Sequence, residues 1–351
     1  MNRRIPRRPR VAAALALALL ALAAGCGKPA PKTLHVYTWA DYIKPEVVQR
    51  FERENGCRIV IDTFDSNEAM YAKLKAGASG YDVLTPSSYY VAIMSGQGML
   101  LELDHAQLPN LANVDTAYLR IALDPQMKYS VPYMLTNTGI AYLKSKVTNV
   151  RPTWAMLDRK DLKGRMTMLN DMRETIGAAL KFLGYSLNTT DEAQLARARD
   201  VVIRWKANLA KFESEQYKSG LASGEFLLAH GYSGDILQAQ KENPDIAFLV
   251  PAEGLSVSCD DLVILKDSKA AALAHRFINF LHDPAVAAEN SLAISYLCPN
   301  MAAYAKLPAS FRDNPAVKLD PAVQAKCEVI RDLGADNAKY TRVWDQIKAA
   351  P

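Results

Sequence analysis

Cysteine and histidine are scarce in this sequence, and neither is arranged for metal or nucleophile chemistry. The 351 residues include five cysteines and five histidines, and no C-x-x-C pair, H-E-x-x-H pair or glycine-rich phosphate loop occurs. These absences exclude the common motifs of zinc enzymes, thiol redox proteins and nucleotide-binding loops. No histidine stands at a motif spacing from an acid or a cysteine, so no Ser-His-Asp site is indicated. We therefore expect no catalytic residue, no metal and no cofactor, and a protein that is not an enzyme.

Low-complexity linkers, internal repeats and long runs of one charge are lacking as well. The chain has 42 Lys and Arg against 37 Asp and Glu, but five of the arginines lie within the first ten residues. Residues 26–351 alone carry 37 basic and 37 acidic side chains. A neutral chain of this kind offers no basic surface, so we expect no nucleic-acid partner. Its length predicts about two domains.

The N-terminus has the pattern of a signal peptide. Five arginines precede Val11–Ala24, a run of 14 residues that are all Ala, Leu or Val. The run is shorter than the roughly 20 residues of a membrane-spanning helix and suits a signal h-region. It leads into Ala-Ala-Gly-Cys26, which resembles the lipobox of bacterial lipoproteins. We predict a signal peptide over 1–25, lipidation of Cys26 and a linker over 26–32; a plain secretory signal cut nearby is the alternative.

The most informative stretch is a predicted strand that runs into a loop and then a helix. Apolar and polar residues alternate over 34–39, and the strand leads into Trp39, Asp41 and Tyr42. Pro45 follows, and proline suits the first turn of a helix. Ligands of open α/β sheets bind beyond the carboxyl ends of strands. Aromatic rings and a carboxylate at this place suit an organic cation.

The rest of the chain continues the alternation of strands and helices that is typical of an α/β protein with a parallel sheet. Extended chain over 129–142 is expected to cross into a second lobe. Predicted strands cover 57–62, 81–85, 166–169, 246–250 and 261–264, and 226–240 belongs to the α/β content of the second lobe. Predicted helices cover 46–54, 65–77, 174–183, 191–212, 270–281, 285–292 and 321–348.

Carboxylates beside aromatic residues recur at the predicted strand-to-helix loops. The residues are Trp39, Asp41, Tyr42, Ser87, Tyr89, Asp171, Glu174, Tyr232, Asp235, Asp260 and Tyr296. Taken singly, each also has an ordinary structural explanation. Asp171 or Glu174 suits the first turn of a helix, Asp235 a solvated surface and Tyr296 a core.

Several of these stretches, in the same order, resemble the substrate-binding proteins of spermidine/putrescine ABC importers. Residues 37–43, Tyr-Thr-Trp-Ala-Asp-Tyr-Ile, are similar to that family's opening Y-x-W-x-[DE]-Y. Residues 64–68, 81–87 and 294–300 resemble its later motifs, and the resemblance covers 33–348. It implies a two-lobed periplasmic-binding-protein type II-like fold, with a ligand cleft between lobes that close by hinge motion.

The resemblance also implies lobe boundaries, a function and partners. Lobe one would comprise 33–136 plus 262–305, and lobe two 137–261 plus 306–351. The protein would be a monomer in the periplasm, held to a membrane by a lipid on Cys26. It would capture polyamines and deliver them to an inner-membrane ABC permease. A polyamine sensor that docks to a signalling protein is the second hypothesis, and a hydrolase or transferase on a similar frame is the third.

By the same resemblance, the eleven residues above become ligand contacts. Asp235 matches an acid of the putrescine-selective branch, and Ile330 falls near an amide of a spermidine-selective protein. Both favour putrescine over spermidine. Ser258 stands where the family has a bulky aromatic residue, which leaves room for a longer ligand or for water. The charge argument outweighs the space argument, because a buried ammonium without a partner is costly.

Four cysteines remain once Cys26 is set aside: Cys57, Cys259, Cys298 and Cys327. In an oxidising compartment they could form two disulfides. Buried apolar thiols are the alternative, and the spacing does not decide between them.

Overall fold

A computed structural model describes residues 32–120 and 122–351, so the predicted signal peptide and Cys26 lie outside the described residues. The strands are β1 (Lys32–Trp39), β2 (Cys57–Phe64), β3 (Val83–Leu84), β4 (Ser130–Leu143), β5 (Met166–Met168), β6 (Lys211–Phe212), β7 (Leu228–Tyr232), β8 (Ile246–Leu249), β9 (Ser256–Ile264) and β10 (Glu328–Val329). The longer helices are α2 (Pro45–Asn55), α3 (Asn67–Lys75), α4 (Ser88–Gly96), α6 (Met172–Phe182), α7 (Glu192–Lys206), α8 (Tyr217–Ser223), α9 (Ser233–Glu242), α10 (Ala271–Leu281), α11 (Pro284–Ile294) and α15 (Asn337–Ala349). Single turns form α5 (Thr116–Leu119), α12 (Met301–Tyr304), α13 (Ala309–Arg312) and α14 (Pro321–Gln324).

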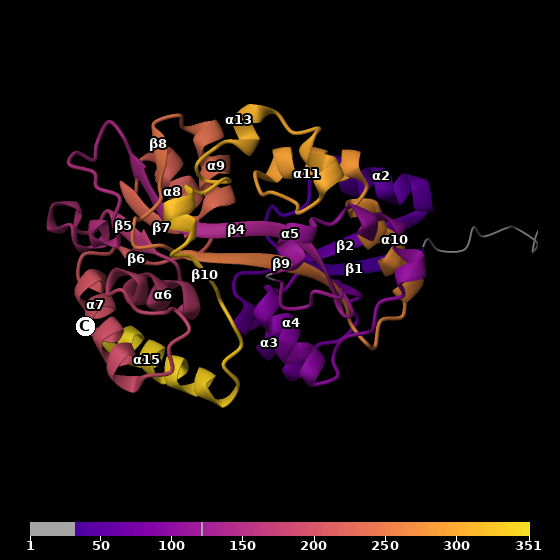
Figure 1. Cartoon of the computed structure of the whole chain (residues 1–351), viewed down its shortest axis with the longest axis horizontal. Coiled ribbons are helices and arrows are strands. Elements are labelled where there is room, and N and C mark those ends of the chain that lie inside the picture. Colours follow the sequence, from indigo (N-terminus) through magenta and orange to yellow (C-terminus); the bar gives the residue numbers. More distant parts are fainter. Residues whose placement is uncertain (1–31, 121) are drawn as a thin grey trace, which may run out of the picture. The chain divides into compact units, whose positions relative to one another are not determined.

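The strands form a continuous hydrogen-bonded ladder in the order β2-β1-β3-β9-β4-β7-β5-β6, with β10 beside β9 and β8 beside β4 (Figure 1). β1 and β3 are parallel, as are β5 and β7. β9 runs antiparallel to both β3 and β4. The predicted α/β class is therefore confirmed, with two parallel groups of strands joined through an antiparallel middle.

The middle of the ladder is one long strand, β4, which confirms the extended chain predicted over 129–142. The first part of β4, Ser130–Asn137, pairs with β9. Its second part, Thr138–Leu143, pairs with β7 and β8. Figure 1 shows β4 and β9 running side by side across the centre of the described chain. A single strand thus connects the two groups of parallel strands.

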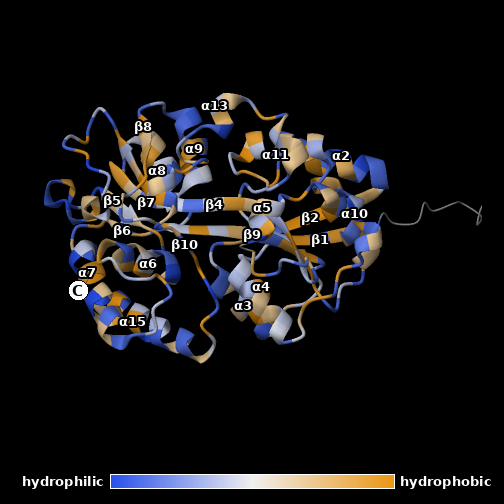
Figure 2. Ribbon diagram, viewed as in Figure 1, coloured by the Kyte–Doolittle hydropathy of each residue, from blue (hydrophilic) through white to orange (hydrophobic). Residues whose placement is uncertain are grey.

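Apolar side chains gather in separate cores on the two sides of this connection. On one side Val36, Phe51 and Phe277 belong to a core built on β1, α2 and α10. On the other side Trp154 and Trp205 belong to a core built on β5, α6 and α7. Figure 2 shows that β1 and β2 are predominantly hydrophobic. β1 is mostly buried, whereas β2 lies at the edge of the ladder and leaves Ile61 exposed. The lobe boundaries proposed from the sequence stay a prediction.

Local signals account for most helix boundaries. α2 has Pro45 in its first turn and ends at Gly56, whose φ of 57° is the left-handed conformation that glycine adopts most readily. Its buried face consists of Val47 and Phe51. The start of α3 differs from the prediction, because Ser66 rather than Asp65 caps it by accepting a hydrogen bond from Ala69 N.

Two predicted helices are wrong in their extent, and long-range strand pairing is the reason in both cases. The helix predicted over 191–212 ends at Lys206, since Lys211 and Phe212 form β6 beside β5. The helix predicted over 321–348 is interrupted by β10, where Glu328 pairs with Ser256 of β9. Local periodicity could not reveal either partner strand, because each lies more than 40 residues away in the sequence.

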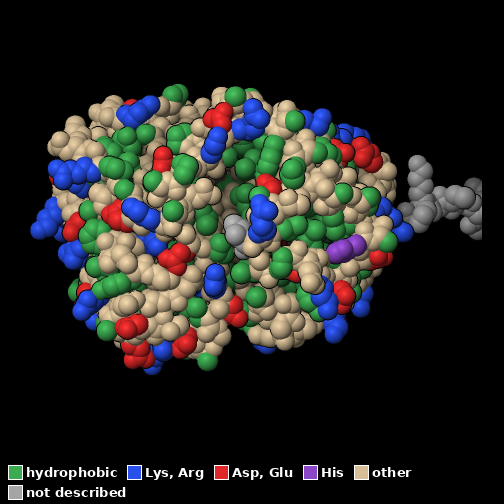
Figure 3. Space-filling view, viewed as in Figure 1, with side chains coloured by type: hydrophobic (Ala, Val, Ile, Leu, Met, Phe, Trp, Pro, Cys, Tyr) green, Lys and Arg blue, Asp and Glu red, His purple; other side chains and the backbone are tan. Residues whose placement is uncertain are grey.

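The four cysteines of the described chain are free thiols, and three of them are buried. Of the two alternatives left open by the sequence, the structure therefore agrees with buried thiols rather than disulfides. Within residues 32–120 and 122–351, no helix is long and apolar enough to cross a membrane. Basic and acidic side chains are interspersed over the face shown in Figure 3.

Candidate ligand-binding site

A cavity of about 270 Å³ lies where the strand ends of the two groups meet, beside the β4–β9 pair. It is slightly smaller than the roughly 300–1,000 Å³ typical of pockets for drug-sized molecules, so a small ligand fits it best. All eleven predicted site residues line it: Trp39, Asp41, Tyr42, Ser87, Tyr89, Asp171, Glu174, Tyr232, Asp235, Asp260 and Tyr296. That these residues bind a ligand stays a prediction.

Strand-to-helix junctions place most of these side chains. Trp39 ends β1, and Asp41 follows it in the left-handed conformation with φ of 54°, which aspartate tolerates better than most residues. Ser87 precedes α4, Asp171 precedes α6 and Tyr232 ends β7 directly before α9. The site therefore forms at the carboxyl ends of strands, where α/β folds usually bind ligands.

Asp260 of β9 is buried in the wall of the cavity and held by two hydroxyl groups. Tyr42 Oη donates to Oδ2 at 2.6 Å and Ser87 Oγ donates to Oδ1 at 2.7 Å. Asn67 Nδ2 in turn donates to Ser87 Oγ at 3.0 Å. Burial raises the pKa of Asp260 to about 6, although the two hydroxyl donors oppose this shift. The carboxylate is thus fixed in position but short of a compensating charge.

The second acidic group of the cavity is a pair of residues, Asp171 and Glu174, at the start of α6. Asp171 Oδ1 caps the helix by accepting from the backbone N–H groups of Arg173 and Glu174 at 2.9 and 3.0 Å. Its Oδ2 accepts from Tyr232 Oη at 3.2 Å. Asp171 therefore caps the N-terminus of α6 and also lies on the cavity wall.

Glu174 is buried one turn further along the same helix. Its Oε2 accepts hydrogen bonds from Thr138 Oγ1 at 3.0 Å and from Ser256 Oγ. Burial and the neighbouring charge of Asp171 raise the pKa of Glu174 to about 8. The positive charge of Arg173 opposes this shift but does not cancel it, so this end of the cavity favours a cation.

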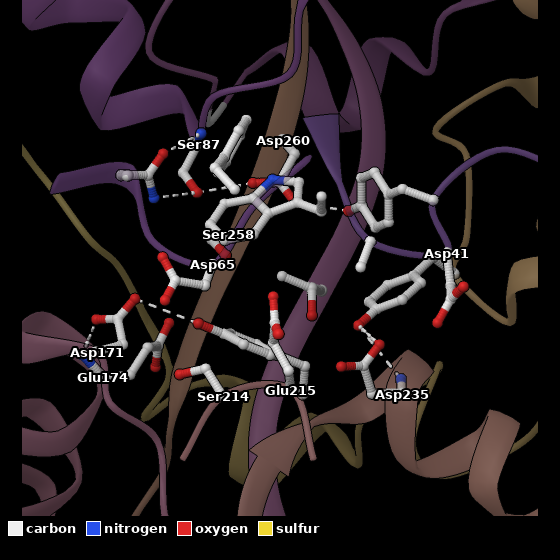
Figure 4. Close-up of a pocket in the computed structure, with 18 of the residues that line it drawn as sticks. Asp41, Asp65, Ser87, Asp171, Glu174, Ser214, Glu215, Asp235, Ser258 and Asp260 are labelled. Atoms are coloured by element: carbon white, nitrogen blue, oxygen red, sulfur yellow. Dashed lines mark hydrogen bonds between the residues drawn. The ribbon is translucent and has the colours of Figure 1, made fainter. Parts of the chain in front are cut away.

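A third group of acids lies at the opposite end of the cavity in Figure 4, where Asp41 and Asp235 face Asp171 and Glu174 across the open space. Asp235 accepts from Tyr217 Oη and Tyr296 Oη, each at 2.8 Å. Close packing fixes Tyr296, since a Cβ added to Gly234 would lie 2.3 Å from its ring.

Aromatic rings form the walls between these acids. The Trp39 and Phe64 rings lie 4.5 Å apart, and Trp39 Nε1 donates to Thr85 O at 2.9 Å. The Tyr42 ring meets that of Tyr296 edge-on with centroids 5.2 Å apart. Such faces suit methylene groups and attract cations.

One hydroxyl group behind the cavity wall makes no hydrogen bond in the part of the chain that the structure describes. This group is the Oη of Tyr89, which is closed off from solvent. Tyr89 therefore lines the cavity with the rest of its side chain.

The cavity carries far more negative than positive charge. Among the described residues that line it, seven are acids and Lys218 is the one basic residue; the acids are Asp41, Asp65, Asp171, Glu174, Glu215, Asp235 and Asp260. Over the described ranges 32–120 and 122–351, no group of three or more His, Cys, Asp and Glu side chains is arranged to hold a metal ion. The chemistry that this site supports is the binding of an organic cation with an apolar body.

The sequence did not single out several lining residues as contacts: Phe64, Asp65, Asn67, Thr136, Ser214, Glu215 and Lys218. Phe64, Asp65 and Asn67 belong to a motif that the resemblance did use, so their order along the chain was a usable signal. Lys218 had no such signal, because it follows a short irregular stretch after β6. Ser258 and Ile330, which the sequence relates to the choice between putrescine and spermidine, also line the cavity.

A two-lobed α/β protein with an acidic, aromatic cleft between strand ends is the architecture of solute-binding proteins. The model of the bacterial extracellular solute-binding protein family matches residues 46–323, and this chain belongs to that family. The fold class expected from the sequence is thereby confirmed.

Individual relatives agree over nearly the whole chain. The putrescine/cadaverine-binding protein of Pseudomonas aeruginosa is 35% identical over 333 residues, which cover 91% of this chain and 94% of that protein. The putrescine-binding periplasmic protein PotF of Escherichia coli is 33% identical over 340 residues, covering 91% and 92% of the two chains. The crystal structure of the Tp0655 (TpPotD) lipoprotein of Treponema pallidum superposes with a TM-score of 0.78 at 35% identity, covering 90% of this chain and 99% of that one.

Proposed function

We propose that this protein captures polyamines, and diamines such as putrescine above all, and delivers them to an ABC permease. The observation that carries the proposal is a pair of buried acidic groups that form no ion pair within the described chain. In residues 32–120 and 122–351, no ion pair reaches Asp260 or Glu174, although both carboxyl groups are buried. Burying a carboxylate is expensive unless a positive charge meets it.

A single diamine molecule can supply a positive charge to both Asp260 and Glu174. Its two ammonium groups are separated by methylenes, and the two acidic groups are separated by the aromatic walls of the cavity. One ammonium would pair with Asp260, the other with Glu174 and Asp171. The names of the relatives from P. aeruginosa and E. coli, both putrescine-binding, support the same ligand class.

Putrescine is preferred to spermidine in this proposal. Ile330 lines the cavity where an amide could otherwise meet a further amine. An apolar side chain there leaves an additional ammonium without a partner, which is costly. Ser258 acts in the opposite direction by leaving space, but water fills such space at modest cost.

Location and partners follow from the same family membership and from the N-terminal sequence. We propose export to the periplasm and lipid attachment at Cys26. The protein would act as a monomeric binding component rather than an enzyme. A polyamine sensor that docks to a signalling protein would use the same cleft, so the cleft does not distinguish these two roles. Loss of polyamine uptake in a deletion strain, restored by the wild-type chain, supports transport.

Calorimetry of the purified protein tests the ligand class. Putrescine, cadaverine, agmatine, spermidine and spermine are titrated separately, and putrescine is expected to bind most tightly. Arginine serves as a cationic control that carries a carboxylate the acidic cavity should reject. If none of the polyamines binds, the proposal is wrong. A spermidine Kd at or below that of putrescine would keep the polyamine class but reverse the ranking.

A further inference from the structure

One lysine side chain connects the two sides of the cavity. Lys218 lies on α8, and its Nζ is 2.9 Å from Asp41 Oδ2 and 3.9 Å from Asp235 Oδ1. Asp41 follows β1 of one group of parallel strands, whereas α8 packs against β7 of the other group. The contact therefore exists only when the two sides are close together.

The lysine is held as a cation in this position. Its side chain is 19% exposed, whereas that of Asp41 is 70% exposed, so the pair lies where the cavity opens to solvent. Burial lowers the pKa of Lys218, but the carboxylates of Asp235 and Asp41 outweigh it and raise the pKa above its usual value. Lys218 therefore carries a full positive charge at neutral pH.

The three acidic groups of the cavity are thus not equivalent. Asp235 accepts two tyrosine hydroxyl groups and has the Lys218 ammonium nearby, so it is already compensated. Asp260 and Glu174 are hydrogen-bonded by neutral hydroxyl groups alone in the described chain. Two positions are left for ligand cations, and a third is filled by the protein itself.

We propose that Lys218 is a built-in third cation that determines how many ammonium groups the cleft accepts. This inference rests on the proposed function and deepens it. A diamine places its charges at Asp260 and at Glu174. A triamine that extends towards Asp235 brings an ammonium against the Lys218 ammonium, and like charges at short range repel each other. Lys218 thus selects against a third charge rather than for the first two.

Removing the charge while keeping the shape tests this role. Lys218→Met retains an unbranched apolar side chain, and Lys218→Arg retains the charge. Putrescine and spermidine are titrated calorimetrically into wild-type protein, both variants and Lys339→Met. Lys339 provides the control because it is a lysine of α15 that pairs with Asp336 away from the cavity. Far-ultraviolet circular dichroism checks that each variant is folded, and Lys218→Gln replaces Lys218→Met if the latter is not.

The proposal predicts a change in selectivity rather than a general loss of binding. In Lys218→Met, the ratio of spermidine Kd to putrescine Kd should fall at least tenfold, mainly through tighter spermidine binding. Lys218→Arg and Lys339→Met should keep the wild-type ratio. An unchanged ratio in Lys218→Met, or one shifted towards putrescine, would overturn the role of Lys218 while leaving polyamine binding intact. If the wild-type protein binds neither ligand, the proposed function and this inference both fail.

Discussion

Tyr42 donates a hydrogen bond of 2.6 Å to the carboxylate of Asp260, although the two residues are 218 positions apart in the sequence. Tyr42 belongs to the first strand-to-helix loop, and Asp260 belongs to β9, which pairs with the long central strand. The hydroxyl group thus ties the beginning of the fold to its middle at the point where a ligand cation is expected. Hydroxyl groups of the protein itself orient the acid, so little further ordering is required on binding.

Neutralising this acid should weaken binding severely. We expect Asp260→Asn to reduce the affinity for putrescine by about 2–5 kcal/mol, the cost of removing one partner from a buried charge pair. Isothermal titration calorimetry measures the change. Asp345→Asn removes an exposed acid of α15 and should leave affinity unaltered. Near-wild-type affinity in Asp260→Asn would reject the proposed role of Asp260.

Binding should release protons near neutral pH. The pKa of Glu174 is about 8, so this group is largely protonated at pH 7. A bound ammonium favours the carboxylate and lowers that pKa, so affinity should rise as pH increases from 6 to 8 and level off above it. Calorimetry in buffers of different ionisation enthalpy should detect the release of about one proton at pH 7.

Glu174→Gln supplies the matched comparison for this pH dependence. The variant cannot ionise at the position, so its affinity should be weaker and nearly independent of pH between 7 and 8. Asp260 should add a smaller pH dependence of the affinity below pH 7, because its pKa is about 6. An unaltered pH profile in Glu174→Gln would mean that another group releases the proton.

The partnerless hydroxyl of Tyr89 offers a test that separates ligand contact from folding. Tyr89→Phe removes a group that makes no hydrogen bond within the described chain, so the melting temperature without ligand should not decrease. Because the hydroxyl is closed off from solvent, putrescine affinity should also stay at the wild-type value. A loss of about 0.5–1.5 kcal/mol would show instead that the hydroxyl becomes accessible and meets the ligand.

Lipid attachment can be examined without reference to the cleft. Cys26→Ser should abolish incorporation of labelled palmitate and yield a protein that still binds putrescine, since the described fold begins at residue 32. Failure of the wild-type protein to take up label would contradict the lipoprotein prediction and favour a free periplasmic protein.

Much of the fold could be predicted because its signals are local. Gly56 at the end of α2 and Pro45 at its start are both recognisable helix-end signals in the sequence. The eleven candidate residues line one cavity because the strand ends of an α/β fold converge. What failed depended on partners distant in sequence. β6 and β10 are two-residue strands whose existence rests on β5 and β9. Lys218 likewise gains its significance from Asp41, 177 residues earlier.

The way the strands cross between the two cores also has a mechanical consequence. β4, β9 and β10 lie side by side there, with Asn137 opposite Val257 and Glu328 opposite Ser256. A hydrogen-bonded strip of three strands bends easily out of its plane, but sliding one strand along another would break the ladder. We therefore expect any opening or closing of the cavity to bend this strip rather than to slide its strands. Thr136 and Ser258 pair on the strip and line the cavity, so such bending would change the shape of the cavity.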